Sequence, residues 1–131
     1  MTEPTPTVMI IEDERLLRLI STMEFEDEGF NVVALSHGEP ALEILASGDQ
    51  VDLLMTDISL PDSIDGWAIA RRARELRPEL PVIYVTGYSP DPVQLVAGAR
   101  FFKKPYLPSA IIEVARGMID AANRRAGEGA V

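Results

Sequence analysis

Short apolar runs alternate with longer segments of helical period along the chain, and this alternation limits the fold more than any other feature. Strand-length runs occupy residues 8–11, 31–35, 51–56, 81–85 and 100–103. Apolar residues recur at helical spacing in residues 14–28, 39–46 and 67–77, and again from residue 108 onwards. Strands that alternate with helices are typical of a parallel sheet with helices on both faces. The sequence therefore predicts an α/β, doubly wound three-layer sandwich.

Five strands and about five helices fit a flavodoxin-like sheet of order 2-1-3-4-5. The apolar faces expected on its helices are Leu16, Leu17, Ile20 and Met23 in the first, Ile69, Ala70, Ala73 and Leu76 in the third, and Ile111, Ile112, Ala115, Met118, Ile119 and Ala122 in the last. With 131 residues the chain is expected to form one domain over 7–125, with a disordered N-terminus at 1–6 and a flexible tail at 126–131.

Charge and composition restrict the partners that the chain can have. It has 12 basic and 21 acidic residues, for a formal net charge of −9. Because nucleic acids and anionic membranes are bound through basic surfaces, neither is expected as a direct partner. The sequence contains no cysteine, no signal-peptide pattern and no apolar run of bilayer-spanning length. These features fit a cytoplasmic location.

Three acidic residues follow strands that should be neighbours in the predicted sheet. Glu12 and Asp13 come directly after the first strand, and Asp57 comes directly after the third. In a sheet of this order, ligands bind beyond the carboxyl ends of the first and third strands. Carboxylates gathered there repel one another unless a cation neutralises them. Mg²⁺ suits such a set because it prefers a few carboxylates and accepts phosphoryl oxygens, and Mn²⁺ is an expected substitute.

Two further residues complete a candidate phosphoryl site. Thr86 ends the fourth strand, and its hydroxyl group can donate a hydrogen bond to an oxyanion. Lys104 follows the fifth strand and supplies a compact positive charge for a phosphoryl oxygen. Pro105 comes next and restricts the backbone beside the lysine, with a cis bond as the minority alternative.

Five motifs in order resemble the receiver domain of bacterial two-component response regulators, a family with the CheY-like fold. They are Ile10-Ile-Glu-Asp-Glu14, Leu53-Leu-Met-Thr-Asp57-Ile-Ser-Leu-Pro61, Asp65-Gly66, Val85-Thr86-Gly87 and Phe101-Phe-Lys-Lys104-Pro105. The resemblance covers residues 7–124. It implies that Asp57 is the phosphoacceptor, with Thr86 and Lys104 in contact with the phosphoryl group.

The same resemblance implies the metal ligands and a switch residue. Asp13 and Asp57 would bind Mg²⁺, with Glu12 acting through water and the backbone carbonyl of Ser59 as a further ligand. Phe101 would rotate inward on activation, although packing in the core explains this residue equally well.

This sequence departs from the family pattern in several places. Glu12 stands where aspartate is commoner, and one extra residue lies between Asp57 and Gly66. Only thirteen residues, 87–99, connect Thr86 to the fifth strand, so a shortened or missing fourth helix is expected. The run Tyr84-Val-Thr-Gly-Tyr88 also resembles, on few residues, a receiver subgroup with a Phe-Ala-Thr-Gly-aromatic motif.

The resemblance implies a stand-alone response regulator that catalyses its own phosphorylation and dephosphorylation without being a classical turnover enzyme. A histidine kinase or histidine phosphotransfer protein would donate the phosphoryl group, and a downstream protein target would receive the signal. Two alternatives stay open: an adaptor that acts without phosphorylation, and a receiver excised from a larger regulator or hybrid kinase. A phosphatase that forms an aspartyl phosphate and a nucleotide-binding protein both fit poorly, because Glu12-Asp13 lacks the spacing of the first and no phosphate-binding glycine loop is present.

Overall fold

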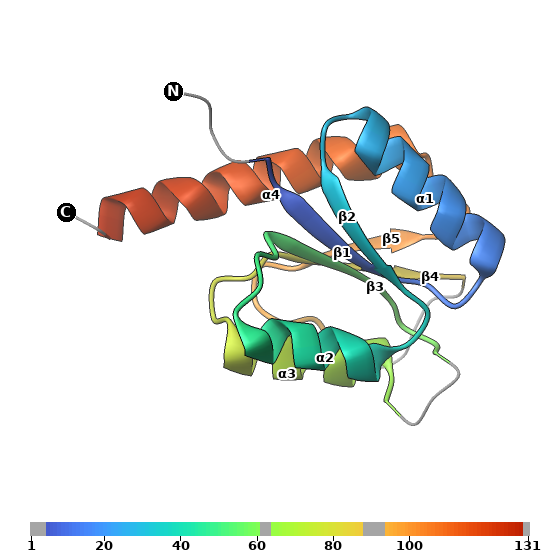
Figure 1. Cartoon of the computed structure of the whole chain (residues 1–131), viewed down its shortest axis with the longest axis horizontal. Coiled ribbons are helices and arrows are strands. Elements are labelled where there is room, and N and C mark those ends of the chain that lie inside the picture. Colours follow the sequence, from blue (N-terminus) through green and yellow to red (C-terminus); the bar gives the residue numbers. More distant parts are fainter. Residues whose placement is uncertain (1–4, 61–63, 88–93, 130–131) are drawn as a thin grey trace.

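A parallel sheet of order β2-β1-β3-β4-β5 forms the centre of the computed structural model, which describes residues 5–60, 64–87 and 94–129 (Figure 1). The strands are β1 (Thr7–Ile11), β2 (Asn31–Leu35), β3 (Leu53–Asp57), β4 (Val82–Thr86) and β5 (Arg100–Lys103). The helices are α1 (Arg15–Asp27), α2 (Gly38–Ser47), α3 (Gly66–Leu76) and α4 (Pro108–Gly129). Each neighbouring strand pair is parallel. The predicted fold class and strand order are confirmed.

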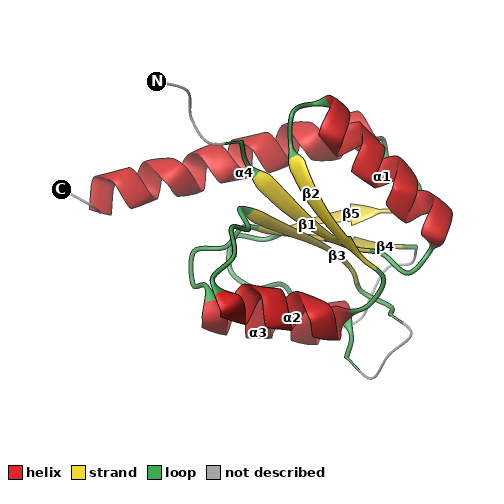
Figure 2. Ribbon diagram, in the orientation of Figure 1, coloured by secondary structure: helices red, strands yellow, loops and turns green. Residues whose placement is uncertain are grey.

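The helices cover the two faces of the sheet in pairs, α1 with α4 and α2 with α3 (Figure 2). Successive side chains of β1 point to opposite faces, so that Val8 and Ile10 join the core beneath α1 and α4. Met9 and Ile11 join the core beneath α2 and α3. Burial on both sides explains why the β1, β3 and β4 segments are almost continuously apolar in the sequence.

The connection from β4 to β5 lacks a helix in the part that the structure describes, which agrees with a shortened or missing fourth helix. Residues 94–99 are irregular, and residues 88–93 lie outside the described part. The Val96 amide donates a hydrogen bond to the Tyr84 hydroxyl group at 3.1 Å, and Arg74 donates one to the Ala97 carbonyl at 2.7 Å. Side-chain hydrogen bonds therefore fix this segment where a helix would supply backbone ones.

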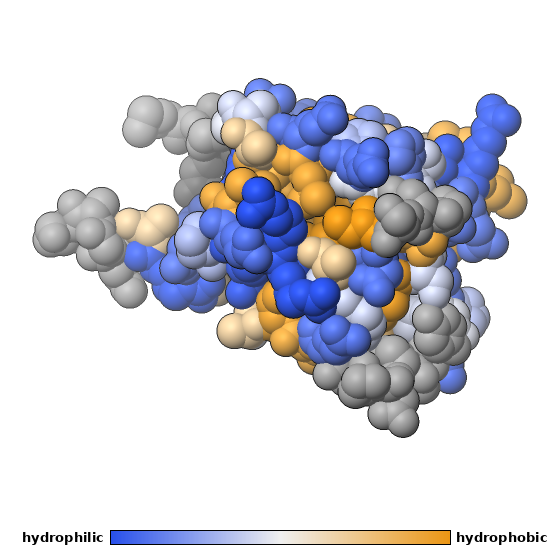
Figure 3. Space-filling view, turned by 90° about the horizontal axis from the view of Figure 1, so that it is seen from below, coloured by the Kyte–Doolittle hydropathy of each residue, from blue (hydrophilic) through white to orange (hydrophobic). Residues whose placement is uncertain are grey.

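Seen from the side of α2 and α3, apolar surface is exposed in the middle of this face of the molecule (Figure 3).

The apolar face expected for the first helix is wrong for most of its members. Leu16, Ile20 and Met23 are exposed, and the helix contacts the sheet through the opposite face, where Ser21 and Phe25 are buried. Two apolar series at helical spacing run along this helix, and helical periodicity alone cannot rank them. An edge-to-face contact between the rings of Phe25 and Phe30, with centroids 5.2 Å apart, favours the observed face.

The apolar faces of the other two helices agree better with the sequence. Ile69, Ala70 and Ala73 of α3 are buried, as are Ile111, Ile112, Ala115 and Ile119 of α4. Helix α4 continues to Gly129, past the end expected near Arg125, and its last turns extend beyond the sheet (Figure 1). Among the described helices, none combines the length and the apolar character that crossing a bilayer requires.

Candidate functional site

Three carboxylates lie together where β1 and β3 end. Glu12 and Asp13 directly follow β1, and Asp57 is the last residue of β3. Each offers one oxygen atom, and the three oxygens lie within 4.8 Å of one another. Glu12 and Asp57 are almost fully buried, whereas Asp13 is exposed. The structure therefore brings together the three acidic residues that the sequence singled out, with one side of the cluster open to solvent.

Lys104 joins this cluster from the end of β5. Its Nζ lies 2.7 Å from Glu12 Oε1 and 2.9 Å from Asp57 Oδ2, and 3.7 Å from a carboxylate oxygen of the exposed Glu14. The Lys104 amide donates a hydrogen bond to the backbone carbonyl of Thr86 at 2.7 Å, which ties the lysine to the end of β4. The Lys104–Pro105 peptide bond is cis.

Burial and charge act in opposite directions on the titration of this cluster. Burial raises the pKa of Glu12 to about 7, against the opposing effect of the Lys104 ammonium group, while the neighbouring Asp57 adds to the rise. Burial lowers the pKa of Lys104, but its close contacts with the Glu12 and Asp57 carboxylates outweigh that effect and raise the pKa above its ordinary value. Lys104 therefore stays positively charged at neutral pH, whereas the Glu12 carboxyl group is present there in both its protonated and its ionised form.

The donor set fits a hard divalent cation such as Mg²⁺. All three groups are carboxylates, the ligand type that Mg²⁺ prefers together with water. Glu12 Oε1 is buried and accepts no well-aligned hydrogen bond among the described residues, so its contact with Lys104 is an ion pair. A buried oxygen in that condition suits a water molecule carried by the metal. The ligand roles of Asp13, Asp57 and the Ser59 carbonyl remain predictions.

The burial of Glu12 makes the stability of the metal-free protein depend on pH. Because its carboxyl group has a pKa of about 7 when folded and an ordinary value of 4.5, the folded state holds a proton that the unfolded chain releases. The free energy of unfolding is therefore expected to fall by up to about 3 kcal/mol as the pH rises from about 4.5 to 7. Denaturant titrations with a chelator present, at a series of pH values, measure this.

Glu12→Gln should flatten that pH profile, and Glu14→Gln serves as the matched control. Glu14 is an exposed neighbour of Lys104, so its substitution should leave the slope unchanged. Added Mg²⁺ favours the ionised form of Glu12 and should reduce the slope in the wild type. A wild-type profile without slope would show that Glu12 is ionised throughout.

A close backbone contact positions the loop that follows Asp57. Gly66 begins α3, and its amide donates a hydrogen bond to the Ile58 carbonyl at 2.8 Å. A Cβ atom at Gly66 would lie 2.2 Å from the Asp57 carbonyl oxygen, a separation that no side chain permits. Asp65 caps α3 by accepting a hydrogen bond from the Ala68 amide at 2.9 Å. Only glycine at position 66 therefore lets α3 start against the end of β3.

The remaining predicted residues lie at different distances from the cluster. Thr86 is fully buried at the end of β4, one strand away from Asp57. Phe101 is half-buried and packs against the core beneath α2 and α3, and its role as a switch remains a prediction. Tyr106 was missed by the sequence analysis, although it follows Lys104-Pro105. Its hydroxyl group makes a hydrogen bond of 2.9 Å with Ser21 of α1.

Magnesium affinity is expected to depend on Asp13, the exposed carboxylate of the cluster. Asp13→Ala removes one of the few direct ligands expected for the metal and should weaken Mg²⁺ binding at least about 10-fold. Trp67 is buried and directly follows Gly66, the residue that packs against Asp57, and the centroids of the Trp67 and Tyr84 rings are 4.7 Å apart. The fluorescence of Trp67 can therefore report binding at the cluster. Glu14→Ala removes an adjacent acidic residue outside the cluster and is the control. Equal affinities in the two variants would contradict the ligand role of Asp13.

Comparison with known proteins agrees with this geometry. Residues 8–116 match the model of the response regulator receiver domain family. The chain is 29% identical over 120 residues to the response regulator receiver protein CpdR of Brucella abortus, covering 88% of this chain and 98% of CpdR. It is 35% identical over 115 residues to the C4-dicarboxylate transport transcriptional regulatory protein DctD of Rhizobium meliloti, covering 85% of this chain and 25% of DctD.

Solved structures give the same result. A response regulator receiver protein from Sinorhizobium medicae superposes with a TM-score of 0.85 at 32% identity, covering 90% of this chain and 97% of that protein. The chain spans from 12% to 48% of the length of the first curated relatives that it matches. The family model, the relatives and the solved structures all point to the same family, and the carboxylates and the lysine at the strand ends agree with it. This chain therefore belongs to the response regulator receiver domain family.

Proposed function

We propose that this chain works as a single-domain response regulator, which accepts a phosphoryl group on Asp57 in the presence of Mg²⁺ and signals through protein contacts. The observation that carries the proposal is the position of Lys104 Nζ, 2.9 Å from Asp57 Oδ2 beside the carboxylates of Glu12 and Asp13. The Asp57 carboxylate would attack the phosphorus atom of the donor, forming an acyl phosphate as the bond from phosphorus to the donor breaks.

Each group of the site has a place in that transfer. Mg²⁺, when bound, neutralises charge on the transferring group. Lys104 stays protonated and can move its hydrogen bond from Asp57 to a phosphoryl oxygen, because it already lies within reach of both carboxylates. Thr86, at the neighbouring strand end, is suited to donate a hydrogen bond to the same group. Water later hydrolyses the acyl phosphate.

Incubation of the whole chain with a small phosphodonor such as acetyl phosphate tests the proposal. Intact mass spectrometry should show the addition of one phosphoryl group with Mg²⁺ and none with a chelator. Mn²⁺ should replace Mg²⁺, since it accepts the same oxygen ligands. Absence of the adduct under both metals would favour the alternative of an adaptor that works without phosphorylation.

The exposed face of α1 supports docking of a protein phosphodonor, a histidine kinase or a histidine phosphotransfer protein, beside this site. Leu16, Leu19, Ile20 and Met23 form an apolar stripe there, with exposed fractions between 41% and 70%. The helix begins two residues after Asp13, so the stripe starts at the open side of the cluster. Contiguous exposed apolar side chains are typical of protein interaction surfaces.

Substitutions in this stripe should separate the two kinds of donor. Ile20→Asp is expected to slow phosphotransfer from a donor protein at least about 10-fold, because a charge then enters the apolar contact. Labelling by acetyl phosphate should be unchanged, since that donor needs no protein surface. Leu95→Asp, at another exposed leucine on the far side of the sheet, is the control. Equal loss with both donors would place the effect in the fold and contradict docking at α1.

A further inference from the structure

Charge is strongly segregated along this chain. Residues 1–65 carry 15 acidic and 2 basic side chains, a net charge of −13, whereas residues 66–131 carry 6 acidic and 10 basic side chains, a net charge of +4. The overall charge of −9 therefore hides a basic second half. Fields of opposite sign on one molecule orient charged partners as they approach.

The topology turns this segregation into two sides of the molecule. Strand order places β2 and β1 at one edge of the sheet and β4 and β5 at the other. The basic half supplies α3, β4, β5 and α4, and so it forms the β5 side. Arg100 and Lys103 on β5, together with Arg124 on α4, are exposed. Among the described residues, none of these three has an acidic side chain within 4 Å.

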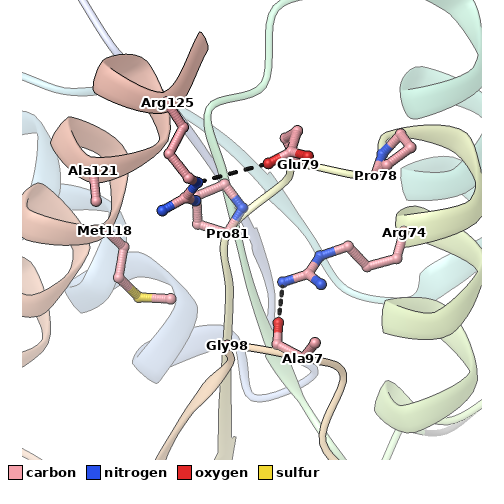
Figure 4. Close-up of a pocket in the computed structure, with 9 residues that line it drawn as sticks. All are labelled: Arg74, Pro78, Glu79, Pro81, Ala97, Gly98, Met118, Ala121 and Arg125. Atoms are coloured by element: carbon pink, nitrogen blue, oxygen red, sulfur yellow. Dashed lines mark hydrogen bonds and ion pairs between the residues drawn. The ribbon is translucent and has the colours of Figure 1, made fainter. Parts of the chain in front are cut away.

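A hollow of about 470 Å³ opens on this side, between α3 and α4 (Figure 4). Pro78, Pro81, Met118 and Ala121 provide its apolar lining. Pro81 precedes β4, and Gly98, which also lines the hollow, precedes β5. Since parallel strands point the same way, the hollow lies at their amino ends, opposite the carboxyl ends that hold Asp57. A ligand in the hollow would leave the phosphoryl site open.

Two arginines line the hollow, and they differ in how firmly their side chains are held. Arg74 is held by the backbone, because its Nε and one terminal nitrogen donate hydrogen bonds to the carbonyls of Leu80 and Ala97 at 2.6 Å and 2.7 Å. Among the residues that the structure describes, Arg125 makes only a long ion pair of 3.7 Å with Glu79, and both side chains are more than half exposed. Exposed pairs of this kind contribute little and exchange easily. Arg125 can therefore pair with an acidic group of a ligand instead.

We infer that the hollow bounded by Arg125, Met118 and Pro81 binds an acidic segment of a partner protein, with one apolar side chain inserted between α3 and α4. The apolar lining accommodates the inserted side chain, and the exposed cations nearest the hollow, Arg100 at the amino end of β5 and Arg124 beside Arg125 on α4, attract the acidic residues around it. This surface is separate from the phosphoryl site and from the α1 stripe, and so it gives the receiver a second partner.

Charge and shape favour this occupant over two others. The net charge of −9 would repel a nucleic acid, and the phosphates of a nucleic acid would gain nothing from the apolar lining of the hollow. A second copy would bring its acidic first half to the basic side, a head-to-tail contact that does not close into a dimer. Both occupants give distinct results in the experiment below.

Selection from a displayed library of random linear peptides on the immobilised full chain tests the inference. Selected sequences should be rich in aspartate and glutamate around one large apolar residue. The synthesised peptides should bind Arg125→Glu and Met118→Glu at least about 10-fold more weakly than the wild type. Arg15→Glu, a matched charge reversal on α1, should bind like the wild type. Higher salt should weaken binding, because exposed charges are screened.

Several results would overturn the inference. They are a selection without acidic enrichment, affinities unaffected by both hollow variants, and a duplex DNA probe that binds more tightly than any peptide. Self-association of the wild type that Arg125→Glu abolishes would assign the hollow to a second copy instead. Circular dichroism and labelling of Asp57 by acetyl phosphate show that each variant is folded, so that loss of binding reports on the hollow alone.

Discussion

Asp57→Asn is expected to abolish phosphoryl uptake, lowering labelling by acetyl phosphate at least about 10³-fold. An amide group is not a nucleophile toward phosphorus. Asp57 is the carboxylate of the cluster that lies at the end of β3, in contact with Lys104. The fold should survive, because asparagine has the same shape and the substitution removes one of three mutually repelling carboxylates. Intact mass spectrometry after incubation with Mg²⁺ gives the result directly.

Asp49→Asn is the matched control for that experiment. Asp49 is exposed after α2, outside the carboxylate cluster, and its substitution should leave labelling at the wild-type level. Peptide mapping of the labelled wild type should place the adduct on Asp57 alone. An adduct on Asp13, or undiminished labelling of the Asp57→Asn variant, would show that the phosphoacceptor is wrongly assigned.

The second large effect is expected at Lys104. Lys104→Ala leaves the buried carboxylates of Glu12 and Asp57 without their cation, which should destabilise the metal-free protein by about 3 kcal/mol above pH 7. The loss should shrink toward pH 5, where protonation of Glu12 relieves the repulsion, and Mg²⁺ should offset part of it. Phosphorylation should slow by about 10²-fold, because a preorganised positive charge no longer faces the transferring group.

Lys103→Ala separates these effects from a general loss of positive charge. Lys103 is the preceding residue and is exposed, with no acidic partner within 4 Å among the described residues. Its substitution should change neither stability nor labelling. The spectral difference between the phosphorylated and unphosphorylated forms should also disappear in Lys104→Ala and persist in Lys103→Ala. Wild-type stability and rate in both variants would mean that Lys104 acts neither on the carboxylates nor on the phosphoryl group.

Chain order alone determined most of the site. In a parallel sheet every strand presents its carboxyl end at the same edge, so the residues after successive strands must meet once the strand order is known. Glu12, Asp57, Thr86 and Lys104 were predictable for that reason. Their spacing along the sequence carried the information, and no long-range packing had to be guessed.

Tertiary packing decided what periodicity could not. Helix α1 has two apolar series at helical spacing, and only contact with the sheet chose Phe25 over Leu16 and Ile20. The pKa of Glu12 likewise depends on its burial between neighbours distant in sequence. The hollow beside Arg125 is lined by α3, α4 and the segments that precede β4 and β5, which are distant from one another in the sequence. Local sequence sets which residues share a helix face or strand end, whereas the burial of that face depends on surfaces contributed by the rest of the chain.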